Sequence, residues 1–228
     1  MTKVKICGLT NETDARHALL SGADFLGFIF YPPSPRAASV DDVRILIRNL
    51  QNTADTGPLF AGDNRPLLIG VFVNETLAAI EATLSYCGLD LAQLSGEEAS
   101  ENVVSAESML RGRAYKSVQP QTAEQARIST INYSAPTPEN APTLMLDAYH
   151  PALRGGTGKT ADWQLAAKVV PLTPRLMLAG GLNPANVAEA VRVVRPFAVD
   201  VASGVEASPG IKDPDKVRQF IAVVRQVK

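Results

Sequence analysis

Eight short apolar runs rich in β-branched residues recur along the 228-residue chain, and each is followed by a longer stretch with helical spacing. The repeat of about 28 residues is close to the ~30 residues of one strand–helix unit. The runs are almost continuously apolar, which is typical of parallel strands buried on both faces. The predicted strands are Val4–Cys7, Phe25–Phe30, Leu68–Val73, Leu89–Leu94, Ala114–Val118, Thr143–Asp147, Leu176–Leu178 and Ala198–Ser203.

Start signals precede several of the predicted helices. Asn11 can cap the first helix and Asn74 the third, while Asn183-Pro184 and Lys212-Asp213-Pro214 open the seventh and eighth. Eight units without an obvious linker favour a closed (βα)8 TIM barrel over an open doubly wound sheet. We therefore predict one α/β domain over residues 1–228.

Composition excludes several classes of protein. The chain has 22 Lys and Arg against 23 Asp and Glu, so no basic excess draws it to nucleic acid or anionic lipid. Two cysteines and two histidines suit neither a disulfide scaffold nor a transition-metal site. No apolar signal segment begins the chain, and the longest apolar run, Leu67–Val73, is too short to span a membrane. We expect a soluble, cytoplasmic protein without a metal or a cofactor.

Two reactive side chains end predicted strands. Catalytic groups of a TIM barrel lie at the carboxyl ends of its strands, where Cys7 ends the first and Asp147 the sixth. These strands are three intervals apart around the ring, so we expect the two groups to face each other across one mouth. The alternatives are a small buried hydrophobe for Cys7 and a helix cap or loop anchor for Asp147. For Cys87, the buried hydrophobe is the favoured interpretation.

Glycine-rich segments follow the last three predicted strands. They are Gly155-Gly156-Thr157-Gly158, Ala179-Gly180-Gly181-Leu182 and Ser203-Gly204-Val205-Glu206. Such loops leave backbone N–H groups free for an anion, and loops after strands 7 and 8 of a barrel commonly bind phosphate. The alternative is glycine that only forms turns. The candidate phosphate-binding residues are Gly156, Gly158, Gly181, Leu182, Ser203 and Gly204.

Arg36 ends a loop that follows the second predicted strand. Three prolines stiffen this loop, Tyr31-Pro32-Pro33-Ser34-Pro35-Arg36, and reduce the entropy lost in fixing its shape. A guanidinium held there can bind a carboxylate through two hydrogen bonds. The alternative is a solvated surface arginine.

The motifs together resemble those of the phosphoribosylanthranilate isomerase family. They are Lys5–Thr10, Gly27–Phe30, Ser34–Arg36, Gly70–Asn74, Gln93–Gly96, Gly155–Gly158, Leu178–Leu182, Asp200–Glu206, Pro209-Gly210 and Lys212-Asp213, and they span the chain in the family's order. The resemblance implies a (βα)8 barrel that carries out an Amadori rearrangement in tryptophan biosynthesis. It also implies a phosphosugar substrate, with the protein acting as a monomer or a homodimer. The chain departs from the family at Ser95, where the family usually has His.

The resemblance assigns roles to the candidate residues. Asp147 would be the general acid that opens the ribose ring, and Cys7, as thiolate, the general base that removes the C2 proton. Arg36 would hold the anthranilate carboxylate, and the glycine loops the phosphate. These roles require a raised pKa for Asp147, and a thiolate of Cys7 stabilised by positive charge or helix-end dipoles.

Other activities remain open at this point. A ribulose-phosphate epimerase would be expected to supply metal-binding His and Asp residues, for which two histidines are too few. The aminoaldose isomerase of histidine biosynthesis uses Asp where this chain has Cys7. A catalytically silent barrel that binds a phosphometabolite or a partner subunit is the alternative from another class.

Overall fold

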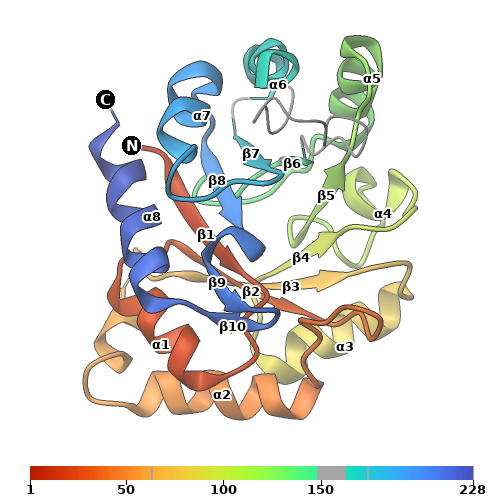
Figure 1. Cartoon of the computed structure of the whole chain (residues 1–228). Coiled ribbons are helices and arrows are strands. Elements are labelled where there is room, and N and C mark those ends of the chain that lie inside the picture. Colours follow the sequence, from red (N-terminus) through yellow and green to blue (C-terminus); the bar gives the residue numbers. More distant parts are fainter. Residues whose placement is uncertain (63, 148–162, 174, 228) are drawn as a thin grey trace.

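The computed structural model describes residues 1–62, 64–147, 163–173 and 175–227. Within these residues, consecutive strands pair in parallel, and β8 pairs back with β1 to close a barrel (Figure 1). The strands are β1 (Lys3–Cys7), β2 (Phe25–Ile29), β3 (Leu67–Phe72), β4 (Leu91–Leu94), β5 (Ala114–Val118), β6 (Leu144–Asp147), β7 (Leu176–Ala179) and β8 (Ala198–Val201). The predicted (βα)8 barrel is confirmed.

A helix follows each barrel strand in the described part of the chain and packs outside the barrel (Figure 1). Neighbouring helices contact one another around the ring, for example α2 with α3, α5 with α6 and α7 with α8. The helices are α1 (Glu12–Leu20), α2 (Val40–Asn52), α3 (Leu77–Cys87), α4 (Glu101–Val104), α5 (Ala123–Tyr133), α6 (Trp163–Val169), α7 (Val187–Val194) and α8 (Pro214–Gln226).

Two of the predicted helix starts are confirmed. The Asn11 side chain accepts a hydrogen bond of 2.9 Å from the Asp14 N–H and caps α1. The Asp213 carboxylate accepts bonds from the N–H groups of Asp215 and Lys216 and caps α8, with Pro214 in the first helical turn. In both cases a short polar side chain satisfies N–H groups that the helix leaves without a partner.

The other two predicted starts are wrong, because each asparagine is used in a turn. Thr76, not Asn74, caps α3, and Asn74 has a φ of +55° with its side-chain oxygen accepting from the Glu97 N–H at 2.6 Å. Asn183 accepts from the Ala185 N–H at 2.9 Å, and α7 begins only at Val187. Asparagine tolerates left-handed backbone and bonds to its own turn, and these properties compete with capping.

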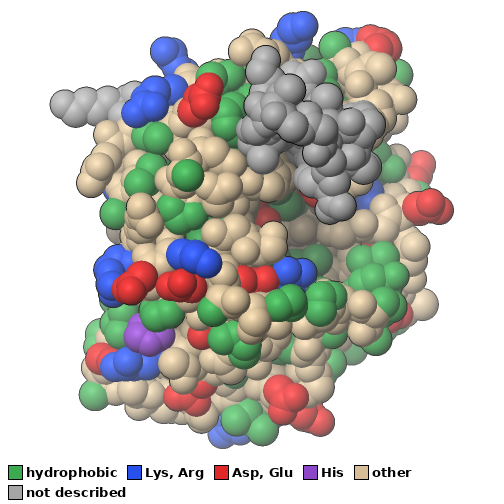
Figure 2. All heavy atoms as spheres, in the orientation of Figure 1, with side chains coloured by type: hydrophobic (Ala, Val, Ile, Leu, Met, Phe, Trp, Pro, Cys, Tyr) green, Lys and Arg blue, Asp and Glu red, His purple; other side chains and the backbone are tan. Residues whose placement is uncertain are grey.

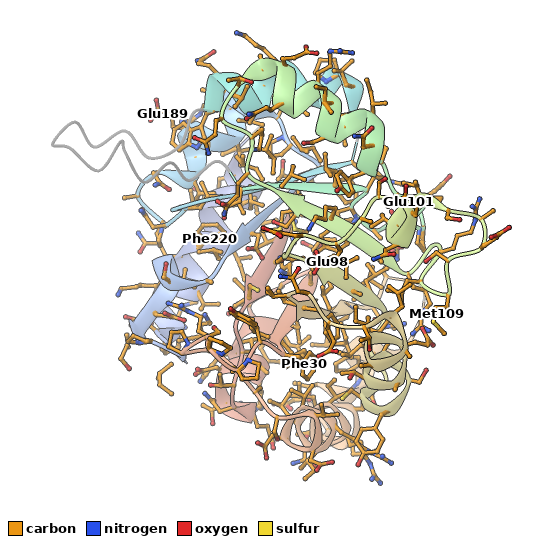
Figure 3. All side chains as sticks on the ribbon, turned by 90° about the vertical axis from the view of Figure 1, so that its right-hand side faces the viewer. Phe30, Glu98, Glu101, Met109, Glu189 and Phe220 are labelled. Carbon is orange, nitrogen blue, oxygen red and sulfur yellow. The ribbon has the colours of Figure 1, made fainter. Side chains whose placement is uncertain are left out.

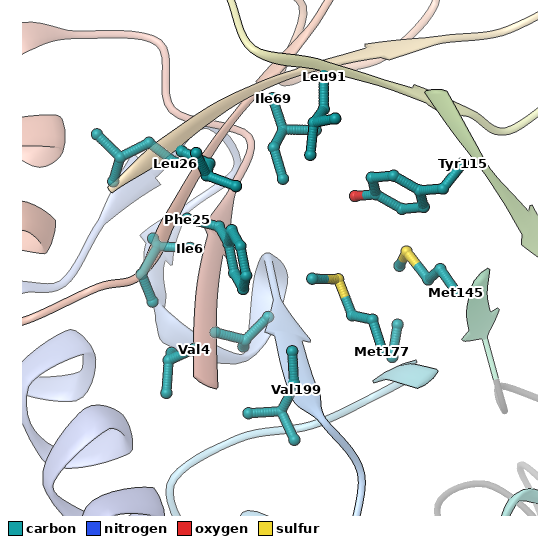
Figure 4. Close-up of a cluster of buried hydrophobic side chains, with 14 of the residues drawn as sticks. Val4, Ile6, Phe25, Leu26, Ile69, Leu91, Tyr115, Met145, Met177 and Val199 are labelled. Atoms are coloured by element: carbon teal, nitrogen blue, oxygen red, sulfur yellow. The ribbon is translucent and has the colours of Figure 1, made fainter. Parts of the chain in front are cut away.

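Apolar side chains fill the barrel interior. Phe25, Tyr115 and Met177 point toward one another between the strands, and each is fully buried (Figure 4). The loops that follow the carboxyl ends of the strands form the functional face of a TIM barrel. There the chain adds a hairpin that the sequence did not predict, formed by β9 (Glu206–Ser208) and β10 (Ile211–Lys212).

Candidate active site

Cys7 and Asp147 line one cavity of about 610 Å³ at the carboxyl ends of the strands. Gln93, Ser95 and Lys116 line the same cavity. In Figure 2 the surface is hollowed near the centre of the view, and acidic and basic side chains gather just below the hollow. The structure thus brings together the two reactive groups that the sequence placed on separate strands.

Cys7 ends β1 with its side chain turned into the barrel and almost completely buried. Its neighbour across the β1–β2 ladder is Gly27, and a Cβ added at Gly27 would lie 2.9 Å from the Cys7 Sγ. Any side chain at Gly27 would therefore displace the sulfur. The sulfur also lies 3.2 Å from the Nζ of Lys5.

Opposing influences act on the Cys7 thiol. Burial raises its pKa most strongly, the charge of Lys5 lowers it, and the charge of Asp200 raises it again. The net effect is a raised pKa, which favours the neutral thiol of Cys7 in the unliganded protein. The expected cation beside the sulfur is nevertheless present, in the form of Lys5.

Asp147 ends β6 and is half-buried at the mouth of the barrel. The Gln119 amide, just after β5, donates a hydrogen bond of 2.9 Å to its Oδ2. Asp147 also lines a second, adjoining cavity of about 370 Å³, as do Met145 and Asp200. The carboxyl group therefore lies where the two cavities meet.

The glycine loops that follow β7 and β8 line the second cavity. Gly181, Leu182, Ser203 and Gly204 all line it. The two loops touch so closely that a Cβ added at Gly204 would fall on the carbonyl oxygen of Leu182. Within the described residues, the N–H groups of Gly181 and Leu182 have no acceptor. Gly156 and Gly158, the other two candidates, lie outside the described residues.

Arg36 is held against Glu206 at the edge of the mouth. Its Nε and Nη2 donate to the two Glu206 carboxylate oxygens at 2.8 and 2.7 Å, and Lys212 donates to the same carboxylate at 2.9 Å. Burial raises the pKa of Glu206, but these cations lower it by more. Glu206 therefore occupies the edge of the Arg36 guanidinium formed by Nε and Nη2. The edge formed by Nη1 and Nη2 is left for a ligand. Arg36 is not among the described residues that line either cavity.

Sequence reasoning missed the role of three polar residues inside the barrel, Lys5, Gln93 and Asp200. They occur in the motifs that resemble the family, but no function was predicted for them. The Lys5 Nζ lies 2.7 Å from Gln93 Oε1 and 2.8 Å from Asp200 Oδ1, and all three side chains are buried. A detectable signal existed, because each is a polar residue whose two neighbours in the sequence are buried and apolar. Lys5 is also two residues from Cys7 and so shares its face of the strand.

A second buried ion pair stabilises the loop after β4. Lys116 Nζ lies 2.6 Å from Glu98 Oε2, and the Glu98 carboxylate also accepts from the backbone N–H groups of Asn74 and Gly96. Burial raises the pKa of Glu98, but these hydrogen bonds and the charge of Lys116 lower it overall. Figure 3 shows Glu98 near the centre of the view, inside the ring of helices. This network ties the ends of β3, β4 and β5 together.

The described part of the chain lacks two other features. No group of three or more His, Cys, Asp or Glu side chains in it is arranged to bind a metal ion. None of its helices combines the length and the apolar character needed to cross a bilayer.

The fold and the site define the class of TIM-barrel enzymes, with reactive side chains and glycine loops at the carboxyl ends of the strands. A family model described as "N-(5'phosphoribosyl)anthranilate (PRA) isomerase" matches residues 4–223. The chain belongs to this family, and it is an isomerase of tryptophan biosynthesis.

Relatives support this membership over the whole chain. N-(5'-phosphoribosyl)anthranilate isomerases from Citrifermentans bemidjiense and Pelobacter propionicus are 42% and 40% identical to it, and each alignment covers 100% of this chain and 98% of the relative. The crystal structure of phosphoribosyl anthranilate isomerase from Thermotoga maritima is similar, with a TM-score of 0.78, 37% identity and 99% of both chains covered.

One similar structure contains a ligand. It is a phosphoribosyl anthranilate isomerase in complex with reduced 1-(o-carboxyphenylamino)-1-deoxyribulose 5-phosphate. Its TM-score to this chain is 0.75, with 34% identity and 99% of both chains covered.

Proposed function

We propose that this isomerase converts N-(5-phosphoribosyl)anthranilate to 1-(2-carboxyphenylamino)-1-deoxyribulose 5-phosphate by an Amadori rearrangement. The observation that supports this most strongly is the shared cavity of Cys7 and Asp147, which adjoins the cavity of the glycine loops. A thiol and a carboxyl that line one cavity suit a reaction that needs a base and an acid. The bound ligand of the similar structure is a reduced form of the proposed product.

Asp147 acts first in the proposed mechanism. Its carboxyl proton passes to the ribose ring oxygen, the bond between that oxygen and C1 breaks, and the anthranilate nitrogen lone pair forms the iminium. Asp147 must therefore be protonated when substrate is bound. Gln119, which donates to its Oδ2, fixes the orientation of the carboxyl group at the junction of the two cavities.

Cys7 acts second. Its thiolate takes the proton from C2, the C–H electron pair forms the C1–C2 double bond, and the iminium nitrogen becomes neutral. The resulting enolamine then tautomerises to the aminoketone, so the reaction neither gains nor loses atoms. Cys7 lines the cavity and has Lys5 beside its Sγ.

The charged ends of the substrate are proposed to bind on either side of the reacting carbons. The phosphate binds the N–H groups of Gly181 and Leu182 and the loop of Ser203 and Gly204, with Gly156 and Gly158 as further candidates. The anthranilate carboxylate binds the free end of Arg36, because Glu206 occupies the other edge of the guanidinium. The guanidinium has five N–H donors, and the two hydrogen bonds to Glu206 leave three of them for a ligand.

Several expectations stay predictions under this proposal. These are one domain over residues 1–228, a cytoplasmic location, function without a metal or cofactor, no nucleic-acid partner, and a monomer or homodimer. One similar structure contains generated monomers of a dimeric phosphoribosylanthranilate isomerase from Thermotoga maritima. Sedimentation of the full chain would distinguish the two states here.

The test of the proposal supplies freshly made N-(5-phosphoribosyl)anthranilate and follows the loss of its fluorescence. We expect the protein to accelerate this loss far beyond spontaneous decay, with the aminoketone as the product separated by chromatography. Loss at the spontaneous rate, with anthranilate as the product, would favour the silent barrel instead.

A further inference from the structure

Lys5 occupies an unusual position for a lysine, at the centre of the barrel with no exposed surface. Its Nζ contacts acceptors from three separate positions in the barrel wall: Cys7 Sγ at 3.2 Å, Gln93 Oε1 at 2.7 Å and Asp200 Oδ1 at 2.8 Å. The contacts with Sγ and with Oε1 are hydrogen bonds, and the contact with Asp200 is a buried ion pair. Burying a charged group is costly unless it is paired, and here Asp200 supplies the opposite charge.

The charge of Lys5 is permanent in this environment. Burial lowers its pKa, but the charges of Asp200, Cys7 and Tyr115 raise it by more, so the net direction is upward. Lys5 therefore cannot accept the substrate proton. What it supplies to the cavity is a fixed positive charge beside the sulfur.

The surroundings of the sulfur make this charge important. The charged and titratable groups that interact with Cys7 are Lys5, Asp200, Lys212, Tyr115 and Arg36. Among the groups that favour the thiolate, Lys5 makes the largest contribution and directly contacts Sγ. Asp200 acts in the opposite direction on the sulfur while holding Lys5 in place.

We propose that Lys5 is a positioning residue that orients the Cys7 sulfur and stabilises its thiolate, while Asp200 and Gln93 hold the Lys5 ammonium. In its effect on turnover this inference rests on the proposed function of Cys7 as the base. Gln93 connects the group further, because it also accepts from Tyr115 at 2.9 Å and donates to Ser95 at 3.1 Å. Four strands thus contribute to the orientation of one sulfur atom.

The alternative is that Lys5 only neutralises Asp200 and has no influence on the thiol. The two interpretations differ in the ionisation of Cys7, which can be measured without substrate. A Cys87→Ser background makes Cys7 the only cysteine of the chain. Cys87 is a suitable residue to replace, because it lies at the end of α3 with its Sγ 3.3 Å from the Val40 carbonyl oxygen.

The experiment follows thiolate absorbance at 240 nm against pH, as a difference from a matched Cys7→Ala variant that subtracts tyrosine ionisation. Lys5→Met should lower the thiolate fraction at a fixed pH by about tenfold or more, because an opposite charge at this distance shifts a pKa by about 1–3 units. Asp200→Asn should raise that fraction. An unchanged titration in Lys5→Met would overturn the proposal.

A second comparison covers the case in which Lys5→Met fails to fold, since it leaves Asp200 buried without a partner. The double variant Lys5→Met/Asp200→Asn leaves no buried charge uncompensated and differs from Asp200→Asn only at Lys5. A lower thiolate fraction in the double variant supports the proposal, and equal fractions contradict it. Because no substrate is present, a failure of this inference is distinct from a failure of the proposed function. A failure of the proposed function would instead appear as full turnover in Cys7→Ala.

The pH profile of turnover gives a further readout. If Cys7 is the base, the acidic limb of kcat/KM in Lys5→Met moves to higher pH by the same amount as the thiol titration. A loss of activity from misfolding would lower the whole profile without moving the limb.

Discussion

The guanidinium of Arg36 forms two parallel hydrogen bonds with the carboxylate of Glu206, in which Nε and Nη2 lie 2.8 and 2.7 Å from its two oxygens. The pair joins the loop after β2 to the hairpin after β8, so segments 170 residues apart in the chain position one guanidinium. Because Glu206 is itself bound by Lys212, the orientation of Arg36 is set before any ligand arrives.

Arg36→Ala should raise KM for N-(5-phosphoribosyl)anthranilate by about 10- to 100-fold with a smaller change in kcat. A hydrogen bond to a charged group contributes about 1.5–3 kcal/mol, and the proposed contact binds the carboxylate before and after the reaction alike. Steady-state kinetics check this. The exposed Arg127, paired with Glu124 on α5, provides the control, since Arg127→Ala should leave KM unchanged. An Arg36→Ala enzyme with the original KM would make Arg36 a purely structural residue.

Gly27→Ala should lower kcat by displacing the sulfur of Cys7. The added methyl would lie 2.9 Å from Sγ and 3.1 Å from the Cα of Cys7, so the ladder between β1 and β2 must shift. The matched control is Gly22→Ala, at a positive φ but with nothing within 4 Å of the added methyl. Turnover and unfolding by urea, measured for both variants, separate the effect on the site from general destabilisation. Equal losses of kcat in the two variants would contradict the predicted displacement.

Glu98→Gln should lower the free energy of unfolding at pH 7 by about 3–5 kcal/mol, because it leaves the buried Lys116 without its anion. The effect depends on pH in a defined direction. The folded-state pKa of Glu98 lies below its unfolded value of about 4.3, so its stabilisation is complete above that value and is lost as the pH falls through the folded pKa.

Urea unfolding at pH 7, 5 and 3 tests this prediction. The difference between the original protein and Glu98→Gln should be similar at pH 7 and 5 and smaller at pH 3. Glu124→Gln, on the exposed surface of α5, serves as the control and should change stability little at any of these values. A Glu98→Gln difference that is the same at pH 3 as at pH 7 would show that the ion pair is not the source.

Much of the barrel could be predicted from the sequence, because parallel buried strands leave a strong apolar signal. Ala114–Val118 was predicted with both ends correct, and the other strands differ by one or two residues at their ends. The hairpin of β9 and β10 was missed because its strands have three and two residues. Strands of two or three residues cannot show the alternation of apolar and polar residues by which a strand is predicted.

The site could be predicted only in part. Strand order placed Cys7 and Asp147 at one mouth, since neighbouring strands of a barrel follow the sequence. The contacts of Lys5 with Gln93 and Asp200 could not be predicted, because they depend on register and tilt across the barrel interior. The ion pair of Arg36 with Glu206 could not be predicted either, because Glu206 belongs to the unpredicted hairpin.

The central claim is that Cys7 and Asp147 act as base and acid on one substrate in their shared cavity. The most direct measurement is kcat for N-(5-phosphoribosyl)anthranilate in Cys7→Ala and Asp147→Asn, with Cys87→Ala as the matched control. We predict a fall of about 10²–10⁴-fold in each of the first two with the fold intact by circular dichroism, and an unchanged kcat in the control. Turnover near the original rate in either Cys7→Ala or Asp147→Asn would contradict the account.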